Sequence, residues 1–141
     1  MRNPKEKVIF ICTQNSARSQ MAEGLLRNMY GDFFDVYSAG TSPSRVNPFA
    51  VKAMADINVD MSAHRSKSIE EFKNEVFDYA ITVCDKAHES CPFFPGRQVT
   101  HHSFSDPATV QGNEAEILAQ FIRVRDEIRQ WLIEQFHPRT A

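Results

Sequence analysis

Long apolar segments are absent from this sequence of 141 residues. No stretch approaches the ~20 apolar residues of a transmembrane helix, so no membrane-spanning segment is predicted. The apolar run at residues 8–12 is also shorter than the ~7–15 residues of a secretory signal core. The net charge is −2 and no run of lysine or arginine stands out, which argues against nucleic-acid binding. These absences predict a cytoplasmic protein that binds neither membranes nor nucleic acids.

Cysteine is scarce, with three in the chain: Cys12, Cys84 and Cys91. Thiols are normally kept reduced in the cytoplasm, and an odd number of them suggests chemistry rather than a framework of disulfides. Repeats, low-complexity segments and interdomain linkers are also missing. With a hydrophobic content of 42%, residues 1–141 are long enough to bury a sizeable core as one domain.

Strand-like and helix-like patterns alternate along the chain, which predicts an α/β domain with a mostly parallel sheet. The expected strands are residues 8–11, 35–39, 78–83 and 99–104. The expected helices run from the loop after Cys12 to near Gly31, from Asn47 to about Ile57, over residues 68–72, and from about Asn113 to Phe136. In the last of these helices, Arg123, Arg125 and Arg129 are expected on the solvated face.

An arginine follows a cysteine after five intervening residues, directly behind the first expected strand. This spacing lets the backbone curl around a tetrahedral oxyanion with successive N–H groups as donors, while the next helix adds its positive end. The guanidinium of Arg18 can hold two oxygens at once, and it favours the nucleophilic thiolate form of Cys12. The predicted anion-binding residues are Thr13, Gln14, Asn15, Ser16, Ala17, Arg18 and Ser19.

Side chains that could react follow the ends of all four expected strands. Cys12 follows the first, Ser38 ends the second, Cys84 follows the third and Asp106 follows the fourth. In an open parallel sheet these ends meet at one carboxyl edge, where such folds bind their ligands. We therefore expect the four groups to converge.

These motifs together resemble the low-molecular-weight protein tyrosine phosphatase superfamily, and within it the thioredoxin-coupled arsenate reductases. The motifs that carry the resemblance are residues 12–19, their continuation through Gly24, Cys84 and Cys91-Pro92, and Asp106-Pro107. The resemblance spans nearly the whole chain. It implies a flavodoxin-like, three-layer α/β domain with a four-stranded parallel sheet in the order 2-1-3-4. It also implies a cytosolic arsenate reductase that serves arsenic detoxification.

The resemblance also implies a role for each reactive residue. Cys12 is expected to form a thiol adduct with arsenate, Arg18 to clamp the anion and Asp106 to act as general acid. A second thiol can attack the sulfur of an arsenic(V) adduct, because the electrons leave with arsenic(III). Cys84 is expected to make this attack and Cys91 to pass the disulfide on. The reductant is expected to be thioredoxin, with glutaredoxin or a small thiol as alternatives; no cofactor is expected, and the protein is expected to be a monomer.

Other functions use the same motifs. A phosphatase for phosphoesters or phosphotyrosine would need no second thiol, although Ala108 and Thr109 stand where such enzymes usually carry tyrosines. A thiol sensor without enzymatic activity would use the loop only for binding. Asp106-Pro107 is also an ordinary turn signal. Ala17 replaces a further cysteine found in many members of the family, which leaves the three-thiol relay intact.

Metal binding is the other interpretation of Cys84 and Cys91, with His88, His101 or His102 as further ligands. Six residues separate the two cysteines, more than the usual two to four of a structural zinc pair. Neighbouring His101 and His102 would also point to opposite faces of a strand. No metal site is therefore predicted.

A potassium ion lies beside the anion loop in some arsenate reductases of this family. The matching residues here are Asn15, Glu23 and Ser38, but Lys67 stands where an acidic ligand completes the site. A lysine in place of a carboxylate puts the ion in doubt. No role is predicted for His64.

Overall fold

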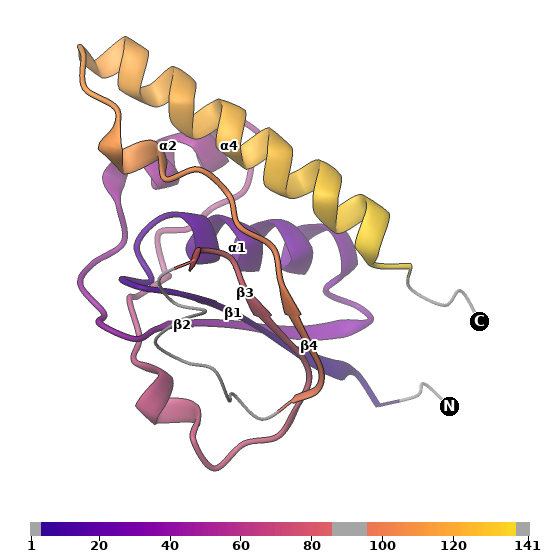
Figure 1. Ribbon diagram of the computed structural model, residues 1–141. Coiled ribbons are helices and arrows are strands. Elements are labelled where there is room, and N and C mark those ends of the chain that lie inside the picture. The colour runs from indigo at the N-terminus through magenta and orange to yellow at the C-terminus, as the bar shows by residue number, and fades with distance from the viewer. Residues whose placement is uncertain (1–3, 86–95, 138–141) are drawn as a thin grey trace.

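The computed structural model describes residues 4–85 and 96–137. Its sheet has four parallel strands: β1 (Glu6–Cys12), β2 (Phe34–Gly40), β3 (Phe77–Thr82) and β4 (Gly96–His101). The strand order is β2-β1-β3-β4, as the resemblance predicts (Figure 1).

The centre of the sheet is apolar and its outer strand is not. Residues Val8 to Ile11 of β1 are fully buried, as expected for a parallel strand covered on both faces. Among the described strands, β4 is hydrogen-bonded to β3 alone, and it exposes Arg97, Gln98 and Val99. It begins three residues before the expected start at 99, because an edge strand with exposed polar side chains lacks the apolar pattern used to locate it.

Three helices are described: α1 (Arg18–Tyr30), α2 (Pro48–Ala55) and α4 (Glu114–Gln135). Helix α1 packs on β1 and β2 and lies between the sheet and α4 (Figure 1). Asn47 caps α2 by accepting a hydrogen bond from Phe49 N at 2.8 Å, which confirms the predicted Asn-Pro helix start. Two short 3-10 helices, η1 (Ile69–Phe72) and η2 (Pro107–Thr109), complete the described elements. None of the helices in this part of the chain has the length and apolar character needed to cross a membrane.

One side chain of α4 does not lie where the helical pattern placed it. Arg125 is only 5% exposed, so the prediction of a solvated position was wrong for this residue, whereas Arg123 and Arg129 are exposed. The Arg125 guanidinium donates to Ala53 O at 2.8 Å and to Asp56 Oδ2 at 3.1 Å. It therefore binds the last turn of α2, where the carbonyl groups and the helix dipole favour a cation.

Candidate active site

A cleft of about 560 Å³ opens where the strands end on the carboxyl side of the sheet. Its lining includes Cys12, Arg18, Cys84, Asp85 and Asp106. The structure thus brings together four of the five residues predicted to be catalytic. The fifth, Cys91, lies outside the described residues.

The Cys12 side chain is buried beneath the loop that links β1 to α1. Its free thiol is 3% exposed and receives the backbone N–H of Asn15, with N to Sγ at 3.2 Å. The Ser19 hydroxyl lies 2.9 Å from the same sulfur. Asn15 has a φ of +50°, a left-handed conformation that asparagine tolerates better than most residues. This turn aims the N–H inward at Cys12.

Gly40, the last residue of β2, lies against the underside of this loop. A Cβ atom at position 40 would be 2.7 Å from Thr13 O and 2.8 Å from Asn15 N. Both atoms belong to the backbone, which cannot move aside without moving the loop. Glycine is therefore required for this close approach.

Arg18 points from the start of α1 toward the loop that follows β4. Its Nη1 donates to Phe104 O at 3.1 Å, and its Nη2 lies 3.4 Å from Asp106 Oδ2. The other carboxylate oxygen, Oδ1, accepts from Ala108 N at 3.0 Å and so caps η2. Asp106 therefore acts as a turn residue and also lines the cleft.

Cys84 lines the same cleft as Cys12 and lies next to the anion loop. Its sulfur is 3.4 Å from the hydroxyl oxygen of Thr13, the residue that follows Cys12, and it is 3% exposed. Val83, just before it, donates from its backbone N to Ile11 O at 2.9 Å. The continuation of β3 therefore delivers Cys84 to the loop that follows Cys12.

Hydrogen bonds beneath the loop fix the orientation of the Asn15 side chain. Its Oδ1 accepts from Gln20 Nε2 at 2.8 Å and from Lys67 N at 2.9 Å. Its Nδ2 must then be the donor to Ser19 Oγ at 2.8 Å and to Ser38 Oγ at 2.9 Å. A hydroxyl has one proton to give. Since Ser19 accepts from Asn15, its own proton is left to donate to the sulfur of Cys12.

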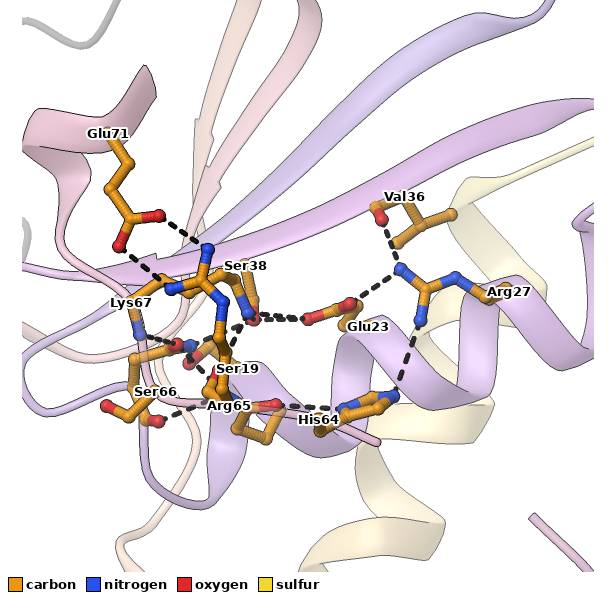
Figure 2. A network of polar contacts seen from close by, with 12 residues as sticks. Ser19, Glu23, Arg27, Val36, Ser38, His64, Arg65, Ser66, Lys67 and Glu71 are labelled. Carbon is orange, nitrogen blue, oxygen red and sulfur yellow. Dashed lines mark hydrogen bonds and ion pairs between the residues drawn. The ribbon is translucent and has the colours of Figure 1, made fainter. Parts of the chain in front are cut away.

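Glu23 is the charged centre of this network (Figure 2). Its side chain is 7% exposed; Oε1 accepts the Ser38 hydroxyl and lies 3.5 Å from Lys67 Nζ, and Oε2 accepts from Arg27 Nη2 at 2.5 Å. Burial by itself would raise the pKa of Glu23, but Lys67, Ser38 and Arg27 together lower this pKa below its usual value. Glu23 is therefore ionised at neutral pH.

The Lys67 ammonium lies near two of the three residues that the resemblance associates with potassium, Ser38 and Glu23. Its Nζ donates to Arg65 O at 2.9 Å and lies 3.5 Å from both Ser38 Oγ and Glu23 Oε1. Burial lowers the pKa of Lys67, while Glu23 acts in the opposite direction. Because these oxygens already surround the Lys67 ammonium, the site does not also fit a metal cation.

His64 contacts Arg27 (Figure 2) and also Gln20. Its Nδ1 is 2.9 Å from Gln20 Oε1 and its Nε2 is 3.3 Å from Arg27 Nη1. Arginine only donates, so Nε2 accepts and Nδ1 carries the proton of a neutral ring. Burial lowers the pKa of His64, which agrees with this state. The sequence analysis assigned no role to Gln20, Arg27 or His64. The available signal for this network was the spacing of Glu23 and Arg27, which lie one helical turn apart.

Neighbouring His101 and His102 point in different directions. The His101 ring lies 2.8 Å from Thr82 Oγ1 and 2.8 Å from Asp85 Oδ1. The His102 ring stacks on Trp131 at 4.9 Å between centroids. Residues 4–85 and 96–137 contain no group of three His, Cys, Asp or Glu side chains arranged to hold a metal. The other residues of the zinc alternative, His88 and Cys91, lie outside these ranges.

Known proteins resemble this chain over nearly its whole length. An arsenate reductase of Halalkalibacterium halodurans is 45% identical over 125 residues, which cover 88% of this chain and 90% of that protein. A solved structure of an arsenate reductase in the oxidized state matches with a TM-score of 0.78 and 28% identity, covering 92% of this chain and 95% of that one.

The thioredoxin-dependent arsenate reductase Cg_ArsC1' of Corynebacterium glutamicum matches with a TM-score of 0.64 and 26% identity. The match covers 96% of this chain and 66% of that one. The model of the family described as low molecular weight phosphotyrosine protein phosphatase matches residues 7–138. With its sheet order, its anion loop and this match, the chain belongs to the low molecular weight phosphotyrosine protein phosphatase family.

Proposed function

We propose that this protein is an arsenate reductase. The observation that carries the proposal is a second cysteine in the cleft of the first: Cys12 and Cys84 line one cleft, and Cys84 Sγ lies 3.4 Å from Oγ1 of Thr13, the residue that follows Cys12. Hydrolysis of a phosphoester needs one thiol, whereas reduction of arsenic needs a second thiol that can attack the sulfur of the first and form a disulfide with it. The arsenate reductases among the relatives support the same conclusion.

The first step binds arsenate to the anion loop. The Arg18 guanidinium and the backbone N–H groups of the loop hold the oxygens, and the Cys12 thiolate attacks arsenic. A sulfur–arsenic bond forms as an arsenic–oxygen bond breaks. The leaving oxygen takes a proton from Asp106, which lies beside Arg18 at 3.4 Å, and departs as water.

The second step is the reduction. The Cys84 thiolate attacks Sγ of Cys12, so that a sulfur–sulfur bond forms and the sulfur–arsenic bond breaks. The electron pair of the broken bond leaves with arsenic, which is reduced from the +5 to the +3 state and released as arsenite. The two thiols are oxidised to one disulfide, which balances the two electrons.

Regeneration needs a third thiol and an external reductant. Cys91 attacks Cys84, which frees Cys12 and carries the disulfide to a dithiol protein of the thioredoxin class. The relative from Corynebacterium glutamicum, described as thioredoxin-dependent, supports this choice of partner. A cytoplasmic location is part of the proposal, because the relay starts from reduced thiols.

Two activities of two variants test the proposal. Cys12→Ser should abolish both arsenate reduction and hydrolysis of para-nitrophenyl phosphate, whereas Cys84→Ser should abolish reduction and keep hydrolysis. The wild-type protein with a thioredoxin system serves as the reference, and circular dichroism checks the fold. Arsenite formation by a folded Cys84→Ser variant would favour a different route. Absence of any turnover in the wild type would favour the thiol sensor.

A further inference from the structure

His101 connects the two sides of Cys84. Its Nδ1 lies 2.8 Å from Oγ1 of Thr82, two residues before the cysteine, and its Nε2 lies 2.8 Å from Oδ1 of Asp85, one residue after it. Thr82 is the last residue of β3 and is paired in register with His101 at the end of β4. The imidazole ring therefore bridges the strand end and the residue that leaves it.

The partners of the ring determine what it can do. The Asp85 carboxylate only accepts hydrogen bonds, so Nε2 of His101 carries a proton and donates it. Nδ1 is occupied by the Thr82 hydroxyl, which can rotate to donate or accept. Both ring nitrogens thus have partners, and His101 is not placed to take a proton from a thiol. Its geometry suits holding a segment in position.

The backbone around Cys84 is attached on the N-terminal side. Val83 N donates to Ile11 O at 2.9 Å, and Val83 O accepts from Phe104 N at 3.1 Å. The His101–Asp85 hydrogen bond extends this attachment past the cysteine. The Asp85 side chain is 76% exposed, so this hydrogen bond lies at the rim of the cleft.

We infer that His101 is a positioning residue for the reducing step, holding Cys84 against the loop that follows Cys12. The inference rests on the proposed arsenate reduction and adds a residue to it. Hydrolysis of a phosphoester uses Cys12, Arg18 and Asp106 but not Cys84. The loss of the bridge should therefore slow the transfer from Cys12 to Cys84 and leave hydrolysis intact.

The experiment compares single-turnover arsenite formation, without external reductant, with hydrolysis of para-nitrophenyl phosphate. In His101→Ala, arsenite formation should fall roughly ten- to a hundred-fold, the scale expected when a reacting group is displaced by about 1 Å. Hydrolysis should stay within about two-fold of the wild type, since the groups that bind the phosphate are unchanged. Gln98→Ala, an exposed change on the same strand, is the matched control and should alter neither activity.

Asp85 supplies a second pair of variants that keeps the test decisive if His101→Ala does not fold. Asp85→Ala should show the same selective loss. Because the Asp85 side chain is exposed, this variant should fold. Asp85→Asn keeps an oxygen acceptor for Nε2 and should recover most of the arsenite rate. Brief treatment with iodoacetamide, read by peptide mass spectrometry, should show faster alkylation of Cys84 relative to Cys12 in both alanine variants.

Each outcome has a clear meaning. A selective loss of arsenite formation, rescued in Asp85→Asn, supports the inference. Equal losses of arsenite formation and hydrolysis would show a general structural role and overturn it, as would an Asp85→Asn variant as slow as Asp85→Ala. If the wild type hydrolyses the phosphoester but forms no arsenite, the proposed function itself fails, and the inference fails with it.

Discussion

Replacing Lys67 with methionine should expose the energetic role of the charged network beneath the anion loop. Removing one partner of a buried ion pair generally costs about 3–5 kcal/mol. The cost here should be smaller, because Glu23 keeps Arg27 and the Ser38 hydroxyl. Burial also lowers the pKa of Lys67, because a buried charge loses its hydration. The methionine variant avoids this cost. We expect a loss of about 1–3 kcal/mol in the free energy of unfolding.

Urea and thermal unfolding measure this loss. For a domain of this size, about 1 kcal/mol corresponds to a shift of roughly 3–5 °C in Tm, so Lys67→Met should melt about 3–15 °C below the wild type. Lys73→Met removes an exposed lysine and is the control, with an expected change within ~0.5 kcal/mol. Equal stability of the two variants would refute the argument that the Lys67–Glu23 pair supports the loop.

The same variant tests the relation of Lys67 to a monovalent cation. Because the ammonium lies among the oxygens of Arg65, Ser38 and Glu23, arsenate reduction by the wild type should be unchanged when potassium replaces sodium at constant ionic strength. Lys67→Met should be less active and should regain part of its activity with potassium. A several-fold stimulation of the wild type that is specific to potassium would contradict the assignment.

Three further predictions concern acid catalysis, pH and the relay. Asp106→Asn should lower hydrolysis of para-nitrophenyl phosphate by about 10²–10⁴-fold, while its stability changes by less than ~1 kcal/mol because the carboxylate is 38% exposed; unchanged hydrolysis would exclude the acid role. Burial lowers the pKa of His64, so near the ordinary value of about 6.5 the unfolded chain binds more protons than the folded one, and stability should rise with pH up to that value. Urea titrations between about pH 5 and 7 should show a weaker slope in His64→Gln than in the wild type, and identical slopes would contradict this cause. Cys91→Ser should complete one turnover and stop with Cys12 joined to Cys84, which peptide mass spectrometry can show; repeated turnover with thioredoxin would leave Cys91 without a role in the relay.

Local signals in the sequence were sufficient for much of the site. The strand, the loop of five residues and the following helix place Cys12 and Arg18 together through short-range geometry alone. Asn47 and Pro48 marked the start of α2 because a cap and a fixed φ act within a few residues. The meeting of Cys84 and Asp106 with Cys12 followed from the rule that parallel strands end on one edge.

Contacts between distant residues were not predictable in the same way. Gln20 and His64 meet across 44 positions of the chain, and no local pattern marks such a pair. Arg125 had the periodicity of a solvated residue, yet α2 presents the carbonyl of Ala53 to it. A helical pattern shows which side of a helix is polar, but not which polar residues a neighbouring helix will cover.

Trp131 gives the molecule an internal optical reporter. It is the single tryptophan of the chain, and its ring is stacked on His102 and lies perpendicular to Phe104 at 6.0 Å. The carbonyl of Phe104 holds Arg18, so a movement of the anion clamp changes the surroundings of the indole. The emission of one fluorophore should therefore report a movement of this clamp in real time, without a label.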